Sequence, residues 1–420
     1  MTKTLFDADR MTWDDAVGLT ARSLETWGRS HRHWVIAWSG GKDSTTLLTV
    51  ILFLITAGRI AAPDRLTVCY ADTRMELPPL SMAAAVIIEQ LRGMGIEVRV
   101  VMAPMDKRFF VYMLGRGVPP PNNNTFRWCT RQIKVEPMHA EIRRLVGEAG
   151  GSQVLVLTGV RQGESAIRDG RIAMSCGVNG AECGQGWYQE MAGEGFATLA
   201  PILHWRVCQV WDWLKVGPPV ELPIAGASRV ERAKRRAAAG PTHGFRTELL
   251  ADAYGGEEAE EINARTGCVG CPLANQDTAL DTVLKLPRWE FLMPLKGLRP
   301  IYRELREPGN RLRQPAGERR KDGTLAPNQC RMGPLTFEAR RWALSRILDI
   351  QARCNAARPA DLPPVDILNA EEVARITELI DAGTWPQKWT GDEPRADEPY
   401  HEGFADGDSQ PLLLGIEDFQ

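Results

Sequence analysis

Residues 39–44 of the 420-residue chain read Ser-Gly-Gly-Lys-Asp-Ser, a combination that suits the binding of phosphate. Two adjacent glycines allow backbone amides to approach an anion closely. Lys42 adds a positive charge, and the flanking serine hydroxyls can donate hydrogen bonds. Apolar runs on both sides predict a strand, a glycine turn and a helix N-terminus, which attracts anions. The spacing differs from the G-x-x-x-x-G-K-[ST] of GTPases and kinases, and the alternative interpretation is an ordinary strand-to-helix turn.

Two further polar segments follow apolar runs. Asp72 and Thr73 come after the run that ends at Tyr70, and they could contact a nucleotide or, through Asp72, a magnesium ion. An aspartate at a strand end is also a common helix cap. The segment Gly159–Arg168 contains Arg161, which could neutralise charge on a departing pyrophosphate, although it could equally be a surface turn.

The cysteines suggest a metal centre. Cys268 and Cys271 form a C-x-x-C pair with glycines beside both, which supplies half of a zinc or iron–sulfur site and needs two distant partners. The first candidate partner is Cys129. It lies among arginines and a lysine at an expected helix start, and positive charge and a helix N-terminus both favour a thiolate. Cys183 and Cys176 are the next candidates. Zinc, an iron–sulfur cluster and a redox pair all remain open from spacing alone.

Alternating strands and helices between residues 35 and 159 would position these groups. Apolar runs predict strands at Val35–Trp38, Leu66–Tyr70, Val98–Met102 and Val154–Leu157. Helical spacing predicts helices at Asp43–Thr56, Leu80–Gly93 and Val135–Val146. The pattern indicates an α/β fold with a doubly wound, mostly parallel sheet, followed by a helical, cysteine-bearing C-terminal portion. Because ligands bind beyond the carboxyl ends of such strands, the motifs should face one crevice.

The remaining chain suggests four parts. We expect an N-terminal helix in residues 1–30, a nucleotide-binding domain in 31–220, a helical, cysteine-bearing and basic portion in 221–385, and an acidic flexible tail in 386–420. Residues 162–198 look irregular, and 202–214 look like a short strand entering a helix. Further helices are expected at 337–352 and 370–382, with a basic tract at 296–321 that could face nucleic acid.

Composition limits the class of protein. The net charge of −2 excludes a globally basic nucleic-acid binder, so such contact would need local patches. No apolar stretch is long enough to span a bilayer, and the first residues lack the pattern of a signal peptide. Nine cysteines without a regular framework fit a reduced compartment, so a cytoplasmic enzyme is expected.

Together these motifs resemble PP-loop ATP pyrophosphatases of the phosphoadenylylsulfate reductase group, which have an adenine nucleotide alpha hydrolase-like fold. Within that group the chain looks most like the DndC- and SspD-type proteins of DNA phosphorothioation. The resemblance runs from Trp34 to Ile350 and includes the glycine-proline loop that leads into the segment Phe126–Pro137. It implies an enzyme that cleaves ATP to AMP and pyrophosphate, adenylates a DNA backbone phosphate and supports replacement of a non-bridging oxygen by sulfur.

The resemblance also implies partners, cofactors and site residues. Sulfur would come from a cysteine desulfurase, with other phosphorothioation proteins as partners and no membrane. The cofactors would be ATP, Mg²⁺ and a [4Fe–4S] cluster. Expected catalytic residues are Lys42, Asp43 and Arg161. Expected nucleotide-binding residues are Ser39, Gly40, Gly41, Lys42, Asp43, Ser44, Asp72, Thr73, Gly159 and Arg161. Expected cluster ligands are Cys129, Cys268, Cys271 and Cys183, with Cys176 as the alternative fourth ligand.

One departure bears on the cluster. DndC-type sequences place another cysteine shortly before the C-x-x-C pair, whereas residues 257–266 here contain none. The fourth ligand would then be Cys183 or Cys176, or one iron would stay open. The alternative functions are an adenylylsulfate or phosphoadenylylsulfate reductase, a tRNA-thiolating PP-loop enzyme, and a non-enzymatic nucleic-acid-binding module. The reductases need a cysteine near the C-terminus, and the last cysteine here is Cys354.

Overall fold

The computed structural model describes most of the chain in two compact units. The described residues are 13–122, 126–150, 153–163, 170, 186–216, 245–256, 267–314, 324, 331–398, 401–403 and 409–411. The first unit comprises residues 1–103, 130–269 and 278–290, and the second comprises 104–129, 270–277 and 291–420. The candidate cluster ligands Cys176 and Cys183 lie outside the described residues.

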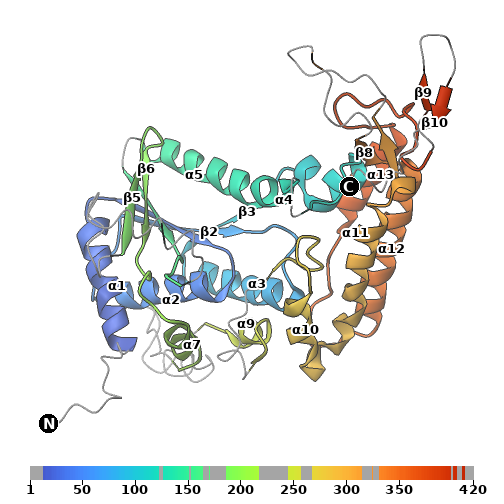
Figure 1. Cartoon of the computed structure of the whole chain (residues 1–420). Helices are drawn as coiled ribbons and strands as arrows, with labels where there is room; N and C mark the ends of the chain where they lie inside the picture. The colour runs from blue at the N-terminus through green and yellow to red at the C-terminus, as the bar shows by residue number, and fades with distance from the viewer. Residues whose placement is uncertain are drawn as a thin grey trace. The chain divides into compact units, whose positions relative to one another are not determined.

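A six-stranded sheet with the order β3-β2-β1-β4-β6-β5 forms the centre of the first unit (Figure 1). The strands are β1 His33–Trp38, β2 Arg65–Ala71, β3 Glu97–Val101, β4 Val154–Thr158, β5 Trp187–Met191 and β6 Phe196–Ala200. Four neighbouring pairs are parallel, and only β5 runs antiparallel to its neighbour β6. The four strands expected from apolar runs are confirmed, as is the mostly parallel α/β class.

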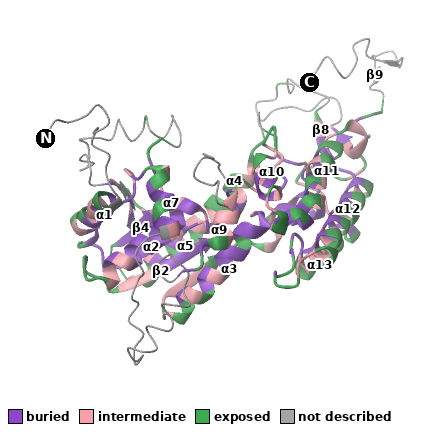
Figure 2. Cartoon of the chain, turned by 90° about the horizontal axis from the view of Figure 1, so that it is seen from below, coloured by how far each residue is buried: buried purple, intermediate pink, exposed green. Residues whose placement is uncertain are grey.

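Helices cover both faces of this sheet, as a doubly wound fold requires. On one face, α5 (Glu136–Glu148) packs Ile142 and Leu145 against residues of β1 and β4, including Val35 and Val156. In Figure 1, α2 (Lys42–Thr56) and α3 (Pro78–Gly93) lie on the opposite face. Figure 2 shows that the buried residues concentrate on the strands and on the helix faces turned toward them.

The first unit contains further α-helices among its described residues. They are α1 Trp13–Gly28, α7 Val207–Val216, α9 Glu248–Asp252 and α10 Thr278–Leu284. Trp213 of α7 donates its indole N–H to the hydroxyl of Thr49 at 2.9 Å, which fixes α7 against α2. Helix α9 packs beside α3.

The segment 162–198 contains regular structure that the sequence did not predict. Strand β5 lies entirely within it and β6 begins within it, and a turn with positive φ at Gly193 and Gly195 joins them. Glycine-rich composition suggested an irregular loop, but glycines in the left-handed region make a tight hairpin possible. The strand expected near residue 202 is also misplaced, because β6 ends at Ala200 and a turn leads into α7.

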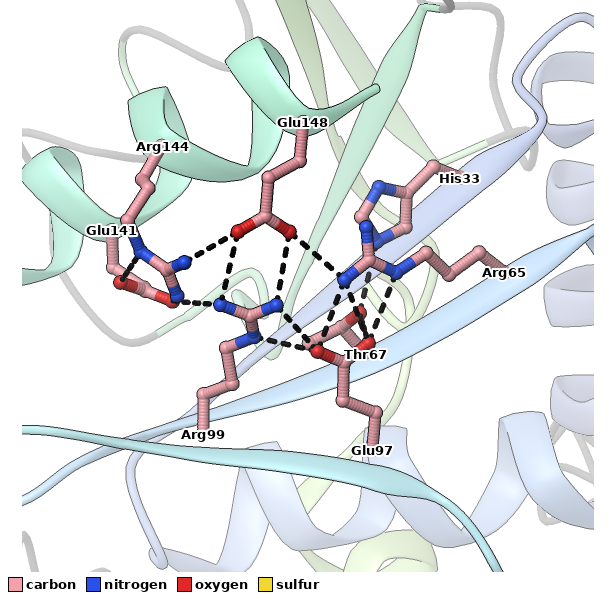
Figure 3. A network of polar contacts seen from close by, with 8 residues as sticks. All are labelled: His33, Arg65, Thr67, Glu97, Arg99, Glu141, Arg144 and Glu148. Carbon is pink, nitrogen blue, oxygen red and sulfur yellow. Dashed lines mark hydrogen bonds and ion pairs between the residues drawn. The ribbon is translucent and has the colours of Figure 1, made fainter. Parts of the chain in front are cut away.

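A network of charged side chains joins the amino ends of the strands to α5 (Figure 3). Arg65 and Arg99 from β2 and β3 both donate to Glu97 and to Glu148. Glu97 lies at the start of β3, whereas the motifs of interest follow the carboxyl ends of the strands. The network therefore lies at the amino ends of the strands, whereas the glycine turn lies at their carboxyl ends.

The second unit is largely helical. Its elements are α11 Leu298–Glu304, β7 Arg311–Arg313, β8 Met332–Leu335, α12 Phe337–Ala356 and α13 Ala370–Asp381, and a hairpin pairs β9 His401–Gly403 with β10 Ser409–Pro411. The short α4 (Trp128–Thr130) lies where the chain passes from one unit to the other. Residues 394–396, within the segment expected as an acidic tail, pair with β7.

A fully buried arginine organises the second unit. The guanidinium of Arg340 lies 4.6 Å from the ring centroid of Phe337 and 4.3 Å from that of Trp385, and the two rings pack against each other with centroids 4.4 Å apart. It donates to the carbonyls of Leu335 and Thr384 at 2.9 and 2.7 Å. Burial lowers the pKa of Arg340 to about 9. In the part of the chain that the structure describes, no helix combines the length and apolar character needed to cross a membrane.

Candidate functional site

The glycine turn joins β1 to the N-terminus of α2. Gly40 has φ +75°, a left-handed conformation that glycine adopts without strain, and a Cβ there would lie 3.3 Å from the ring of Tyr70. Gly41 is the N-cap of α2 and has no side-chain hydrogen bond to the first turn. The hydroxyls of Ser39 and Ser44 lie 3.1 Å apart within the turn. The expected phosphate-binding turn therefore has the strand–turn–helix geometry that such a site requires.

The segment after β4, which begins at Gly159, packs directly against this turn. A Cβ at Gly159 would lie 2.8 Å from both the Cα and the backbone N of Ser44, so only glycine fits there. The expected nucleotide-binding residue Gly159 thus lies against the first turn of α2. Its close approach is what brings Arg161 to the glycine turn.

Three charged side chains meet beside the turn. The guanidinium of Arg161 donates to one carboxylate oxygen of Asp43 at 2.6 Å, and the ammonium of Lys42 donates to the other at 3.1 Å. Arg161 also donates to the backbone carbonyl of Trp205 at 3.1 Å. Lys42 and Arg161 are buried, and Asp43 is largely so. The site thus places two cationic side chains in partly desolvated surroundings, which suits stabilisation of phosphate charge.

The loop after β2 holds a second polar cluster. Asp72 accepts a hydrogen bond from the backbone N–H of Arg74 at 2.9 Å, and Arg74 has φ +61°. The hydroxyl of Thr73 donates to the Glu76 carboxylate at 2.6 Å. Burial raises the pKa of Glu76, and the bond from Thr73 partly offsets that effect. Asp72 and Thr73 therefore form a tight turn that Glu76 stabilises.

One cysteine of the C-x-x-C pair lies against this loop. The backbone of Cys268 forms an antiparallel bridge with that of Glu76, and the N–H of Val269 donates to the carbonyl of Met75 at 2.7 Å. Cys268 and the loop after β2 belong to the same unit. The structure thus brings the C-x-x-C motif and the loop after β2 together, a contact that the sequence did not predict.

Cys129 and Cys271 belong to the second unit. The indole of Trp128, beside Cys129, donates to the carbonyl of Pro119 at 3.2 Å and stacks on Phe109. The guanidinium of Arg306 donates to the carbonyl of Pro272, which follows Cys271, at 3.2 Å, and also to the carbonyl of Pro121. Arg306 therefore joins the triple-proline loop to the end of the C-x-x-C motif.

The expected metal centre is incomplete among the described residues. They contain no group of three or more histidine, cysteine, aspartate or glutamate side chains arranged to hold a metal ion. The candidate fourth ligands Cys183 and Cys176 lie outside the described residues. The described donors therefore do not by themselves fit a four-thiolate cluster.

Tyr254 is a site residue that sequence reasoning missed. Its hydroxyl accepts a hydrogen bond from the backbone N–H of Lys42 at 3.1 Å, and its ring centroid lies 5.1 Å from the Lys42 ammonium. The two residues are 212 positions apart. The local sequence Ala-Tyr-Gly-Gly carries no motif, so only the folded chain places this tyrosine at the glycine turn.

Comparison with known proteins finds similarity over part of the chain. No curated protein matches significantly. Among solved structures, phosphoadenylyl-sulfate reductase from Candida auris, in a phosphate complex, is 13% identical with a TM-score of 0.29 over 50% of this chain and 85% of that chain. FMN adenylyltransferase from Candida glabrata, with FMN and the ATP analogue AMPCPP, is 15% identical with a TM-score of 0.32 over 52% and 62%.

A family match locates the similarity more closely. Residues 33–218 match the family described as the phosphoadenosine phosphosulfate reductase domain. The matched residues hold the parallel strands, the glycine turn and Arg161. This segment, fewer than half of the 420 residues, is therefore similar to the phosphoadenosine phosphosulfate reductase domain.

Proposed function

We propose that the chain is an ATP pyrophosphatase that adenylates a DNA backbone phosphate and supports replacement of a non-bridging oxygen by sulfur. The observation that carries the ATP-cleaving part is the meeting of Lys42, Asp43 and Arg161 at the glycine turn. The DNA and sulfur parts rest on the resemblance of the motifs to DndC-type proteins. The position of Cys268 beside the loop after β2 supports the sulfur part.

In this proposal the turn binds the β- and γ-phosphates of Mg²⁺-ATP. The backbone amides at the start of α2 and the Lys42 ammonium contact the leaving pyrophosphate, and Arg161 neutralises the charge that develops on it. Asp43 acts as a positioning residue, because its two carboxylate oxygens hold both cations. Asp72 is the candidate for contact with the metal or the nucleotide.

The proposed chemistry has two displacements. A non-bridging oxygen of a DNA phosphodiester attacks the α-phosphorus of ATP, and the bond to pyrophosphate breaks. Sulfur, as hydrosulfide, then attacks the activated DNA phosphorus, and AMP leaves with the oxygen that DNA supplied. When the sulfur arrives from a cysteine desulfurase as a persulfide, a second thiol cleaves the S–S bond and the resulting disulfide is reduced by an external dithiol.

Pyrophosphate release measured with Mg²⁺-ATP and DNA tests the first displacement. Lys42→Ala should lower pyrophosphate release about 100-fold or more, because a preorganised cation is lost at the leaving group. Lys285→Ala, at an exposed position of the same unit, is the matched control and should leave the rate unchanged. Pyrophosphate release at the normal rate from Lys42→Ala would contradict the assignment. Mass spectrometry of digested DNA for phosphorothioate tests the second displacement.

A [4Fe–4S] cluster on Cys129, Cys268 and Cys271, with Cys183 or Cys176 as fourth ligand, remains part of the proposal. Anaerobic purification followed by iron and sulfide counts and a visible spectrum tests it. Cys268→Ser and Cys271→Ser should lose iron, whereas the exposed Cys208→Ser should retain it. A colourless protein that contains zinc would remove the cluster from the proposal.

The family match favours a second candidate, a phosphoadenylylsulfate or adenylylsulfate reductase. Such an enzyme needs an accessible nucleophilic cysteine. Cys354 is fully buried in α12, and burial raises its pKa to about 11, which disfavours the thiolate. Thioredoxin-dependent release of sulfite from either sulfated nucleotide would favour the reductase over the DNA-modifying enzyme.

A further inference from the structure

The hydroxyl of Tyr254 occupies the hydrogen-bonding position at the start of α2 that a phosphate oxygen would use. It accepts from the Lys42 backbone N–H at 3.1 Å, and a Cβ at Gly41 would lie 3.3 Å from it. An amide N–H makes one good hydrogen bond, and two oxygens cannot share the same place in front of it. A phosphate bound to this amide and Tyr254 in this position are therefore mutually exclusive.

The ring of Tyr254 engages the second phosphate-binding group of the turn. Its centroid lies 5.1 Å from the Lys42 ammonium, close enough for a cation–π attraction. Tyr254 thus contacts both the amide and the side chain of the residue that would bind the leaving pyrophosphate. It does so while 3% exposed, with its ring packed edge-on against Trp211 at 5.2 Å.

The backbone that carries Tyr254 is anchored independently of the turn. Thr247 donates its hydroxyl to the carbonyl of Leu214 at 3.0 Å, and Asp252 accepts from the Trp289 indole at 2.9 Å. These contacts do not involve α2. Movement of the Tyr254 side chain away from the Lys42 amide would therefore not require these contacts of its segment to break.

We propose that Tyr254 is an intramolecular competitor for the phosphate-binding turn, which polyphosphate displaces when ATP binds. This inference rests on the proposed nucleotide-binding function and adds a residue that sets its affinity and selectivity. ATP and pyrophosphate carry the phosphates that reach the turn, so both must displace Tyr254. AMP lacks them and does not.

A further consequence concerns product release. After cleavage between the α- and β-phosphates, return of Tyr254 to the Lys42 amide opposes rebinding of pyrophosphate. The same contact that weakens ATP binding therefore makes cleavage harder to reverse.

Calorimetric titration of the full chain with α,β-methylene ATP, pyrophosphate and AMP tests the proposal. Tyr254→Phe keeps the ring and removes the competing oxygen, so affinity for α,β-methylene ATP and pyrophosphate should rise about 2- to 10-fold, the value of one net hydrogen bond. Affinity for AMP should not change. Tyr188→Phe, which removes a hydroxyl from β5, is the matched control and should alter none of the three affinities.

Tyrosine-selective chemical modification followed by peptide mass spectrometry gives a second measurement on the unsubstituted chain. Pyrophosphate should increase labelling of Tyr254, because displacement brings a buried ring toward solvent. Unchanged or weaker binding by Tyr254→Phe, or unchanged or reduced labelling with pyrophosphate, would overturn the competitor role while leaving the proposed function intact. Failure of the unsubstituted chain to bind either polyphosphate would overturn the proposed function and this inference together.

Discussion

Gly159 approaches Ser44 so closely that a Cβ on the glycine would lie 2.8 Å from the Cα and backbone N of the serine. This contact joins the end of β4 to the first turn of α2. It is the structural condition for placing Arg161 beside Asp43. The glycine turn is thus supported by a segment more than a hundred residues away in the chain.

Gly159→Ala should lower both stability and nucleotide affinity. The added methyl group meets backbone atoms, which cannot rotate away, so the free energy of unfolding should fall by about 1–3 kcal/mol. Urea unfolding and calorimetric nucleotide titration measure the two effects. Gly147→Ala in α5, where a Cβ meets open space, is the control and should be neutral or slightly stabilising. Full nucleotide affinity in Gly159→Ala would show that the close approach is unnecessary.

Asp43→Asn should be more damaging than its small change in size suggests. The carboxylate pairs with the buried cations Lys42 and Arg161, and its loss leaves two positive charges close together. Removing one partner of a buried ion pair costs about 3–5 kcal/mol. A double-mutant cycle with Arg161→Met, read from urea unfolding, should give a coupling energy above about 1 kcal/mol. Additive losses would mean that the pair contributes little.

Arg340→Met should destabilise the second unit by about 3 kcal/mol. The substitution keeps apolar contact with Phe337 and Trp385 but leaves the buried carbonyl of Leu335 and the partly buried carbonyl of Thr384 without this donor. Arg346→Met, on an exposed position of the same helix, should change stability by less than about 0.5 kcal/mol. Thermal unfolding monitored by calorimetry compares the two variants, and equal melting temperatures would contradict the expected role.

Stability should fall as the pH drops below about 6.5, in part through His33. Burial lowers the pKa of His33 from its ordinary value of 6.5, and nearby Arg65 adds to the effect, although Glu97 opposes it. The unfolded chain then binds a proton at a higher pH than the folded chain, so acidification favours unfolding. Burial also lowers the pKa of His31 and His204.

Urea unfolding at several pH values between 8 and 5 measures this dependence. His33→Gln retains a polar group near Thr67, which the ring contacts at 2.9 Å, and removes the titration. The loss of stability on acidification should therefore be smaller in the variant, though not abolished. An unchanged slope would mean that His33 does not contribute.

Sequence reasoning was most successful where the signal was local. Apolar runs predicted four strands of the sheet, and helical spacing predicted α2, α3, α5, α12 and α13 to within a few residues. It failed for β5 and part of β6. Glycines are typical of loops, and only the pairing of β5 with β6 in the folded sheet shows that these glycines form the turn of a hairpin.

The site divides in the same way. The identity of the glycine turn, of Arg161 and of the C-x-x-C pair could be read from residue type and spacing. Three contacts could not be predicted from the sequence, because each joins residues far apart in the chain. They are Arg161 with Asp43, Cys268 with Glu76, and Tyr254 with Lys42.

The amino-acid sequence alone determined which segments alternate between strand and helix, and it indicated which of them could bind phosphate, because both depend on short-range spacing. Tertiary structure alone decided which side chains share a site. Contacts between residues far apart in the chain depend on the order of the strands in the sheet. They also depend on close packing of backbone segments, as at Gly159, where any side chain would clash with Ser44.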